Sequence, residues 1–468
     1  MFVSCSESGA RSGGRRRGFV LLTTAAMVVL VLLPTIGLAV DAGMMYLVQS
    51  LLSGASDAAS IAGARDLARG SDDSTQRANA VTTANTFFAS NFPAGYLGAT
   101  NLQVSNVAAT DSTYMRSITT KASVDLPFVF MRALGLDHIT LNVTAKATRR
   151  DVNIMIVMDR SGSLTTSGSC TPLKAAAVNF VDKFAEGRDN LGLITFATSS
   201  RVDVPLTTTF KTTVEGTLNS LVCTGATSSA QALWQSYQQL ANLAQTGALN
   251  VILFFTDGRP TAVTENFPIA NGSGCSSHVA KLGVLTPGYT TGGVVTNTIF
   301  GLYSGDAPAQ PLATDLTVIS SNSGCAFKSD QTKVTSDVSY APPTDHWGNS
   351  LNATAYRTVT TSGAGFSITS GQNVENFSTN AADHAALRIR RGDADPLNAN
   401  RALPGVVVYS IGLGNVDSVL LERIANDPSL TPNPVAAGNT GRYVYAADAT
   451  QLNLAFTQVA SQLLRLSR

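Results

Sequence analysis

The longest apolar stretch of the chain lies close to its amino terminus, from Gly18 to Val40. About 20 apolar residues suffice to cross a bilayer, so this pattern predicts a transmembrane helix at residues 19–40. Arginines collect on the cytoplasmic side of membrane helices, which places the basic tail, residues 1–18, in the cytoplasm. No second stretch is long enough to return, so we expect a single-pass protein whose bulk is extracytoplasmic. The interruptions of the stretch are Thr23, Thr24, Pro34 and Thr35, and the arginines before it are Arg11, Arg15, Arg16 and Arg17.

The same stretch could instead be a cleaved signal peptide, with Val40-Asp41-Ala42 as its cleavage site. We favour a retained anchor, because the stretch is long for a signal peptide and the helical pattern continues through Leu52. Small residues then follow at helical spacing. They would allow close helix contact, either as a self-association face or with the chain's own downstream domain. These residues are Gly54, Ala55, Ala58, Ala59, Ala62 and Gly63.

Residues 41–150 combine a helical pattern with an alternating one. A polar, alanine-bearing helix is predicted over residues 74–92. Apolar and β-branched residues on alternate positions then predict strands. A small α+β region should therefore join the anchor to the rest of the chain. It shows no cluster of acids, histidines or cysteines, so we interpret it as a spacer or an oligomerisation module. The strands are expected around Leu102–Ala109, Ser117–Val124 and Ile139–Ala147, with a short apolar turn at Phe128–Leu136.

From Asp151 onward, short continuous apolar runs alternate with amphipathic stretches. Such runs predict buried parallel strands, and amphipathic stretches predict helices that cover them. Residues 151–468 should therefore form an α/β domain on a doubly wound, mostly parallel sheet. The expected strands are Ile154–Met158, Val251–Phe255 and Val406–Ile411, with a strand pair at Asn190–Phe196 and Arg201–Leu206. The expected helices are Pro172–Glu186, Ser228–Leu243, Asp417–Asn426 and Ala449–Leu464.

One stretch of this domain, residues 262–380, shows little periodicity and is rich in Gly, Ser, Thr and Asn. Ordinary connections take only a few residues, so we expect a large irregular insertion here. Because its start follows Asp257 closely, it could cover the ligand-binding edge of the sheet. Equally, it could be a surface decoration with no role at that edge.

Five oxygen-bearing side chains lie just beyond predicted elements of this domain. Four of them follow two of the predicted strands, and the fifth lies in the loop before a predicted helix. Ligands bind at the carboxyl ends of the strands in sheets of this kind. Two carboxylates and three hydroxyls meeting there would make a hard-oxygen shell suited to Mg²⁺. The five residues are Asp159, Ser161 and Ser163 in D-R-S-G-S, Thr227 in C-T-G-A-T-S-S, and Asp257 in T-D-G.

These three segments resemble the metal-ion-dependent adhesion site of von Willebrand factor A domains, with D-x-S-x-S, a lone threonine after a glycine, and T-D-G. The resemblance implies the doubly wound fold and a bound Mg²⁺ (or Mn²⁺). It also implies that one coordination position stays open for an acidic group of a protein partner.

The amino-terminal 50 or so residues resemble TadG-like proteins of bacterial tight-adherence (Flp) pilus assembly. In that family a membrane helix runs through an "L-P … G-L-A-V-D-x-G … Y" pattern into an alanine-rich helix. The resemblance implies a bacterial cytoplasmic (inner) membrane location and a partner among pilus or cell-envelope components. The matching positions are Pro34, Gly37, Leu38, Ala39, Val40, Asp41, Gly43 and Tyr46.

Cysteine usage fits an extracytoplasmic domain. Cys5 precedes the anchor, whereas Cys170, Cys223, Cys275 and Cys325 follow it in a space that permits disulfides. Three pairings are possible. If the fold is of the expected kind, a Cys170–Cys223 bond would brace the metal loops. Cys275 and Cys325 could then staple the insertion, and the alternative for each pair is free buried thiols.

The overall charge excludes one class of function. A net charge of +1 with 13% charged residues gives no field that would gather nucleic acid. The four histidines show no zinc spacing, and Ser161 is not in a G-x-S-x-G nucleophile elbow.

The leading hypothesis is therefore a membrane-anchored, non-enzymatic binding protein. The alternatives are a metal-dependent phosphoester hydrolase and a purely structural envelope module.

Overall fold

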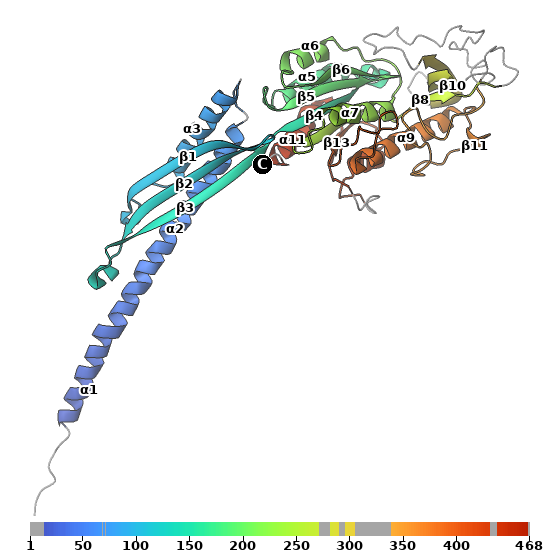
Figure 1. The fold of residues 1–468 in the computed structure, drawn as a ribbon. Coiled ribbons are helices and arrows are strands. Elements are labelled where there is room, and N and C mark those ends of the chain that lie inside the picture. The colour runs from blue at the N-terminus through green and yellow to red at the C-terminus, as the bar shows by residue number, and fades with distance from the viewer. Residues whose placement is uncertain are drawn as a thin grey trace, which may run out of the picture. The chain divides into compact units, whose positions relative to one another are not determined.

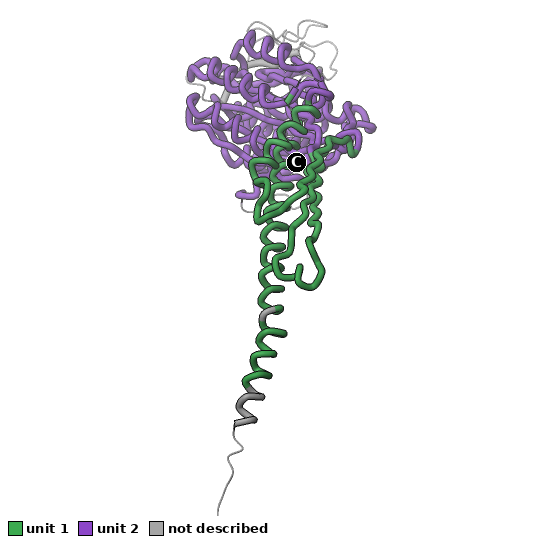
Figure 2. The backbone as a smooth tube through the Cα atoms, turned by 90° about the vertical axis from the view of Figure 1, so that its left-hand side faces the viewer, with its two compact units in different colours: residues 1–69, 76–111, 116–148 green, residues 70–75, 112–115, 149–468 purple. Residues whose placement is uncertain are grey.

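A computed structural model describes residues 14–67, 69–70, 72–270, 281–289, 295–304, 338–430 and 438–466 (Figure 1). The chain divides into two compact units (Figure 2). The amino-terminal unit holds residues 1–69, 76–111 and 116–148. The α/β unit holds residues 70–75, 112–115 and 149–468.

A long helical segment begins the amino-terminal unit. Helix α1 (Gly14–Met27) passes through a π-helical turn, η1 (Val28–Leu32), into helix α2 (Leu33–Asp66). Pro34 has no N–H, and its ring cannot follow a regular turn. The wider turn before it and the Thr35 hydroxyl, which donates to the carbonyl of Leu32 at 3.2 Å, accommodate it. Among the described residues this is the one helix long and apolar enough to cross a membrane, as expected.

The second half of α2 and helix α3 (Asp73–Asn91) pack on a sheet of order β1-β2-β3. Residues such as Val48, Leu52, Phe88 and Ile118 form the core between them. The small residues of α2 are used here: a Cβ on Gly63 would lie 2.9 Å from the carbonyl oxygen of Ala80. The structure therefore shows these residues contacting the chain's own fold. The strands are β1 (Thr100–Ser112), β2 (Met115–Pro127) and β3 (His138–Arg150), with 3₁₀ turns η2 (Tyr96–Gly98) and η3 (Met131–Leu134).

A six-stranded sheet of order β14-β13-β7-β4-β5-β6 organises the α/β unit. Four neighbouring pairs are parallel, and β5 with β6 is antiparallel, which confirms the predicted doubly wound, mostly parallel sheet and its strand pair. Strand β14 was not expected from the sequence. The bounds are β4 (Val152–Asp159), β5 (Asn190–Phe196), β6 (Ser200–Thr207), β7 (Leu249–Thr256), β13 (Val407–Leu413) and β14 (Tyr443–Ala446).

Helices cover both faces of this sheet, so β4 is buried on both sides. Met155 and Val157 point to one face, whereas Ile154, Ile156 and Met158 point to the other. Helices α7 (Ser229–Leu243), α9 (Gly371–Arg391) and α10 (Ser418–Ala425) pack on the first face. Helices α5 (Cys170–Val181), α6 (Lys211–Ser220) and α11 (Leu452–Leu466) pack on the second, and the 3₁₀ turn η4 (Ala449–Gln451) precedes α11.

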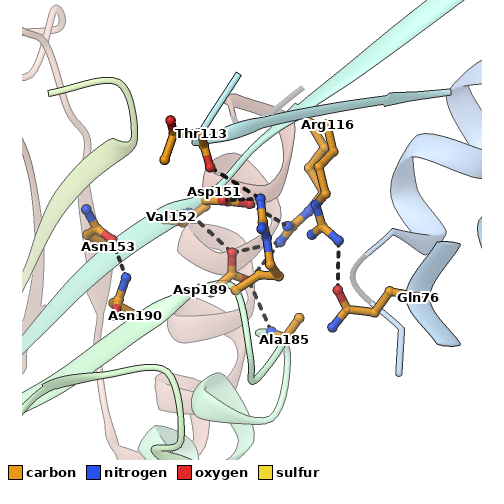
Figure 3. Close-up of polar contacts among 11 residues, drawn as sticks. Gln76, Thr113, Arg116, Asp151, Val152, Asn153, Ala185, Asp189 and Asn190 are labelled. Carbon is orange, nitrogen blue, oxygen red and sulfur yellow. Dashed lines mark hydrogen bonds and ion pairs between the residues drawn. The ribbon is translucent and has the colours of Figure 1, made fainter. Parts of the chain in front are cut away.

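A buried ion pair fixes the amino end of β4. The carboxylate of Asp189 accepts from the backbone N–H groups of Val152 and Ala185, at 3.2 and 3.0 Å (Figure 3). It also accepts two bonds from the guanidinium of Arg149, at 3.0 and 2.7 Å. A buried carboxylate with four such bonds is fully satisfied, so this end of the sheet is rigidly held.

The stretch expected to be irregular contains regular structure. Strands β8 (Val263–Phe267), β9 (Lys281–Tyr289) and β10 (Val295–Ser304) form an antiparallel sheet, and β11 (Thr361–Ser362) pairs with β12 (Gly365–Phe366). Helix α9 begins at Gly371, before the predicted end of the insertion near residue 380. The described parts of the 262–380 insertion thus include short antiparallel strands, which the sequence did not reveal because its Gly- and Thr-rich stretches lack a simple period. Cys275 and Cys325 lie outside the described residues.

Candidate functional site

Asp159 ends strand β4 at the carboxyl edge of the sheet. The backbone N–H of Ser161 donates to Asp159 Oδ1 at 2.7 Å, and the Thr256 hydroxyl donates to its Oδ2 at 2.5 Å. Thr256 ends strand β7, and the β4–β7 register places Met158 opposite Phe255. The two strand ends therefore meet, and Asp159 is fully buried with its two oxygens held in place.

Three more oxygens lie in a triangle beside Asp159. The hydroxyls of Ser161 and Ser163 lie 3.0 Å apart. Both donate to Asp257 Oδ1, at 3.3 Å from Ser161 and 2.7 Å from Ser163. Ser161 is the residue before the short helix α4 (Gly162–Thr166), which turns Ser163 back toward the sheet edge. The structure thus brings four of the five predicted side chains into one hydrogen-bonded group.

Thr227, the fifth predicted residue, lies at the same edge. Its backbone pairs with the loop after β7: its N–H donates to the Thr261 hydroxyl at 3.1 Å, and its carbonyl accepts from the N–H of Thr261 at 2.9 Å. A Cβ built on Gly258 would lie 3.9 Å from the Thr227 hydroxyl. Thr227 therefore adjoins the Asp257–Gly258 turn, although among these described residues its hydroxyl forms no hydrogen bond to the other four side chains.

Backbone hydrogen bonds join the loops that carry the site. The N–H of Gly162 donates to the carbonyl of Gly225 at 3.0 Å, and the N–H of Thr224 donates to that of Arg160 at 2.7 Å. Gly225 has a φ of 97°, and a Cβ there would lie 2.9 Å from the hydroxyl of Thr198. Only glycine suits this position without strain, so the glycine before Thr227 has a structural reason.

A disulfide between Cys170 and Cys223 also ties these loops, which confirms the expected pairing. Cys170 begins helix α5, and Cys223 lies in the loop that leads to Thr227. The Thr165 hydroxyl donates to the carbonyl of Cys223 at 2.6 Å and adds a second link between the same segments. The loop carrying Thr227 is therefore fixed to the loop carrying the serines.

The two carboxylates of the site are costly to ionise together. Burial, together with the nearby Asp257 carboxylate, raises the pKa of Asp159 to about 7. Burial also raises the pKa of Asp257, although the hydroxyls of Ser163 and Ser161 lower it in part. Like charges in a water-poor place repel each other, and a divalent cation between them would remove that cost.

The oxygen spacing fits a small hard cation. Octahedral ligands about 2.1 Å from Mg²⁺ lie about 3.0 Å from their neighbours. The separations within the Ser161, Ser163 and Asp257 triangle range from 2.7 to 3.3 Å. Among the described residues no group of three or more His, Cys, Asp or Glu side chains could hold a metal, so a cation held at this edge would have hydroxyls among its ligands. This donor set is the kind that Mg²⁺ and Mn²⁺ accept.

Sequence reasoning missed two residues of this edge. Thr256 holds Asp159, and Thr198 lies under the Gly225 turn and accepts the N–H of Ala226 at 3.0 Å. Thr256 is the first residue of the T-D-G segment, so its place directly before Asp257 was a signal. Thr198 lies two residues after the end of strand β5, and no pattern in the chain marks it.

Two family models match the chain. Residues 154–259 match the von Willebrand factor type A domain model, and residues 18–66 match the model described as putative Flp pilus-assembly TadE/G-like. The α/β unit is therefore built on a von Willebrand factor type A (vWA) domain. A TadE/G-like region precedes this domain in the chain, as the sequence predicted.

A curated relative and several solved structures are also similar. The uncharacterized protein YfbK of Escherichia coli (strain K12) is 30% identical over 107 residues, which is 23% of this chain and 18% of that protein. The chain thus matches less than a fifth of that relative's length. The PilB minor pilin from Streptococcus sanguinis is 14% identical, with 79% of each chain covered and a TM-score of 0.35. The vWF domain of the type V pili tip protein Mfa5 from Porphyromonas gingivalis is 14% identical, with 69% of this chain and 98% of that one covered and a TM-score of 0.37. Scores of this size support no inference about function.

Proposed function

We propose that the α/β unit binds Mg²⁺ (or Mn²⁺) and, through the cation, an acidic side chain of a protein partner. The observation that carries this proposal is the triangle of oxygens of Ser161, Ser163 and Asp257 next to a buried second carboxylate. The cation would neutralise the two acids and keep part of its positive charge, because hydroxyls are neutral ligands. The proposed ligands are Asp159, Ser161, Ser163, Thr227 and Asp257.

The proposed setting is adhesion or assembly at the cell envelope. The TadE/G-like region and the apolar helix would hold the chain in the bacterial inner membrane, with the basic tail inside and the vWA domain outside. The partner would then be a pilus or cell-envelope component that offers an Asp or Glu side chain. The cation supplies the electrostatic attraction, and the loops braced by the Cys170–Cys223 bond keep its ligands in place.

Metal binding is tested with Mn²⁺ itself, measured by electron paramagnetic resonance on the detergent-solubilised chain. Ser163→Ala should weaken Mn²⁺ binding at least about tenfold, by analogy with the loss of supporting groups at other metal sites. Ser167→Ala is the matched control, because Ser167 is a nearby exposed hydroxyl whose bonds go to Leu164 and Ser169. Equal weakening in both variants, or no binding by the wild type, would contradict the site.

Adhesion is tested on cells that carry the wild type, Asp257→Ala or Ser167→Ala. The proposal expects attachment in Mg²⁺ that is lost in chelator and in Asp257→Ala, while Ser167→Ala behaves like the wild type. Attachment that persists in chelator would rule out a cation-mediated contact, even if the purified protein binds Mn²⁺.

A further inference from the structure

The loop between strands β2 and β3 carries an apolar surface that the α+β fold does not cover. Its backbone closes on itself, since the N–H of Phe128 donates to the carbonyl of Asp137 at 3.0 Å. Four of its large side chains are nevertheless exposed: Val129 by 61%, Phe130 by 48%, Leu134 by 75% and Leu136 by 48%. Exposed apolar patches of this kind mark a contact with something outside the fold.

Two contacts fix this loop to helix α2. The Asp41 carboxylate accepts from the backbone N–H groups of Val129, Phe130 and Met131, at 3.0, 3.0 and 2.8 Å. Next to it, the Phe130 ring covers Gly37, where a Cβ would lie 2.6 Å from the Cβ of Phe130. The loop therefore has a defined place on the helix, and the absence of a side chain at Gly37 permits the close approach.

That place coincides with the outer end of the apolar helix segment. At 1.5 Å per residue, Gly37 lies about 28 Å along the helix from Gly18, and the hydrocarbon core of a bilayer is about 30 Å thick. Neighbouring helix residues Ile36, Leu38 and Val40 are exposed as well, so the apolar surface of the helix continues directly into that of the loop. Both belong to the amino-terminal unit.

We propose that the loop of residues 128–136 inserts into the outer half of the bilayer beside helix α2, as a second membrane contact. This inference rests on the membrane anchor of the proposed function and adds to it. The continuity of the loop with the apolar helix favours lipid over a protein partner as the occupant. Its one charged side chain, Arg132, is exposed and can reach the headgroups while the apolar side chains face the acyl chains.

The experiment uses the full chain in phosphatidylcholine vesicles whose lipids carry bromine at known depths, which quenches tryptophan fluorescence. The wild type gives the background, because its two tryptophans, Trp234 and Trp347, are buried in the α/β unit. Leu134→Trp should lose most of its added emission to bromines near the headgroups. Leu30→Trp, within the apolar helix, should lose its emission to bromines near the bilayer centre.

The matched control is Val107→Trp, an exposed apolar position on strand β1 of the same unit, which should keep its emission. A second loop variant, Val129→Trp, guards against a local defect in Leu134→Trp and should behave like it. Quenching at Leu30 but at neither loop position would overturn the inference and leave the anchor intact. A blue-shifted loop emission without quenching would assign the loop to a protein contact, which also overturns it. Quenching at none of these positions would overturn both anchor and loop.

Discussion

In the first half of the long helical segment, leucines and valines face outward, whereas every residue of strands β4 and β7 is buried. Both sequences are strongly apolar, so composition does not separate them. The difference lies in the neighbours: β4 has a strand on each edge and helices on each face. The helix from Leu21 to Val40 has almost no neighbouring elements within its own fold, so its apolar surface is open to a partner outside the chain. Burial is decided by topology, and hydropathy alone does not reveal it.

The largest loss of stability is expected when a buried side chain of the sheet is truncated. Leu253→Ala, in the centre of β7, should lower the free energy of unfolding by roughly 2–5 kcal/mol, because a cavity remains in a closely packed core. Leu30→Ala, exposed on the helix, should change it by no more than about 0.5 kcal/mol in detergent. Urea unfolding followed by the fluorescence of Trp234 and Trp347 measures both. Similar losses for the two variants would refute the contrast.

A slightly smaller effect is expected from the disulfide, which belongs to the α/β unit. Cys223→Ser should lower the stability of this unit by about 2–4 kcal/mol, because the unfolded chain gains conformational freedom. The urea midpoint reported by the same two tryptophans checks this. Cys5→Ser is the control, since Cys5 precedes the anchor. If the midpoint is insensitive both to Cys223→Ser and to reductant, the bond contributes nothing to folding.

Each unit also contains a buried carboxylate, and the two differ in their hydrogen-bond partners. Asp41 has three N–H donors, whereas neither oxygen of Glu265 in strand β8 has a hydrogen-bond partner among the described residues. Burial raises the pKa of Glu265 well above its usual value, and the nearby Asp345 carboxylate raises it further. Folded Glu265 therefore keeps its proton at a pH where the unfolded chain has released it.

Stability should consequently fall as the pH rises above about 4.5, because the folded state binds more protons than the unfolded state there. Glu265→Gln should flatten this fall and raise the free energy of unfolding at pH 8 by about 1–3 kcal/mol. Urea unfolding from pH 4 to pH 8 is the measurement, with Glu215→Gln on helix α6 as the control. A steeper fall in Glu265→Gln would show that the carboxylate has a partner that stabilises its ionised form.

The smallest expected effect concerns the other carboxylate. Asp41→Asn keeps one acceptor oxygen but loses the negative charge, so the free energy of unfolding should drop by only about 1 kcal/mol. The local effect should be larger: the amides of Val129, Phe130 and Met131 should exchange with deuterium faster. Asp57→Asn, exposed on the same helix, should leave their exchange unchanged. Unchanged exchange in Asp41→Asn would mean that the loop does not depend on this carboxylate.

Much of the sheet could be predicted because its strands bury both faces, and continuous runs such as Ile154–Met158 mark such strands. The convergence of Asp159 with Asp257 also followed, since parallel strand ends meet at one edge. Strand β14 escaped prediction because it is short and half exposed, and Y-V-Y-A has no distinctive period. Strands β8 to β10 escaped because glycines and threonines obscure the alternation in their stretch.

The finer parts of the candidate site depend on contacts between distant residues, which no local pattern records. Thr198 matters only because the Gly225 turn passes over it, and Thr256 because β7 pairs with β4. In the amino-terminal unit the apolar turn at Phe128–Leu136 was visible in the sequence. Its attachment to Asp41 and Gly37 was not, because about 90 residues of chain separate them.

The helical segment runs without a break from Gly14 to Asp66, and its second half lies in the core of the amino-terminal unit. At 1.5 Å per residue it is a rod about 80 Å long. Tension applied to that unit would therefore pass into the anchor through packed side chains and helical hydrogen bonds, with no slack linker to absorb it. In the proposed envelope setting, such a rod would transmit a pull on the amino-terminal unit to the membrane as a stiff mechanical coupling.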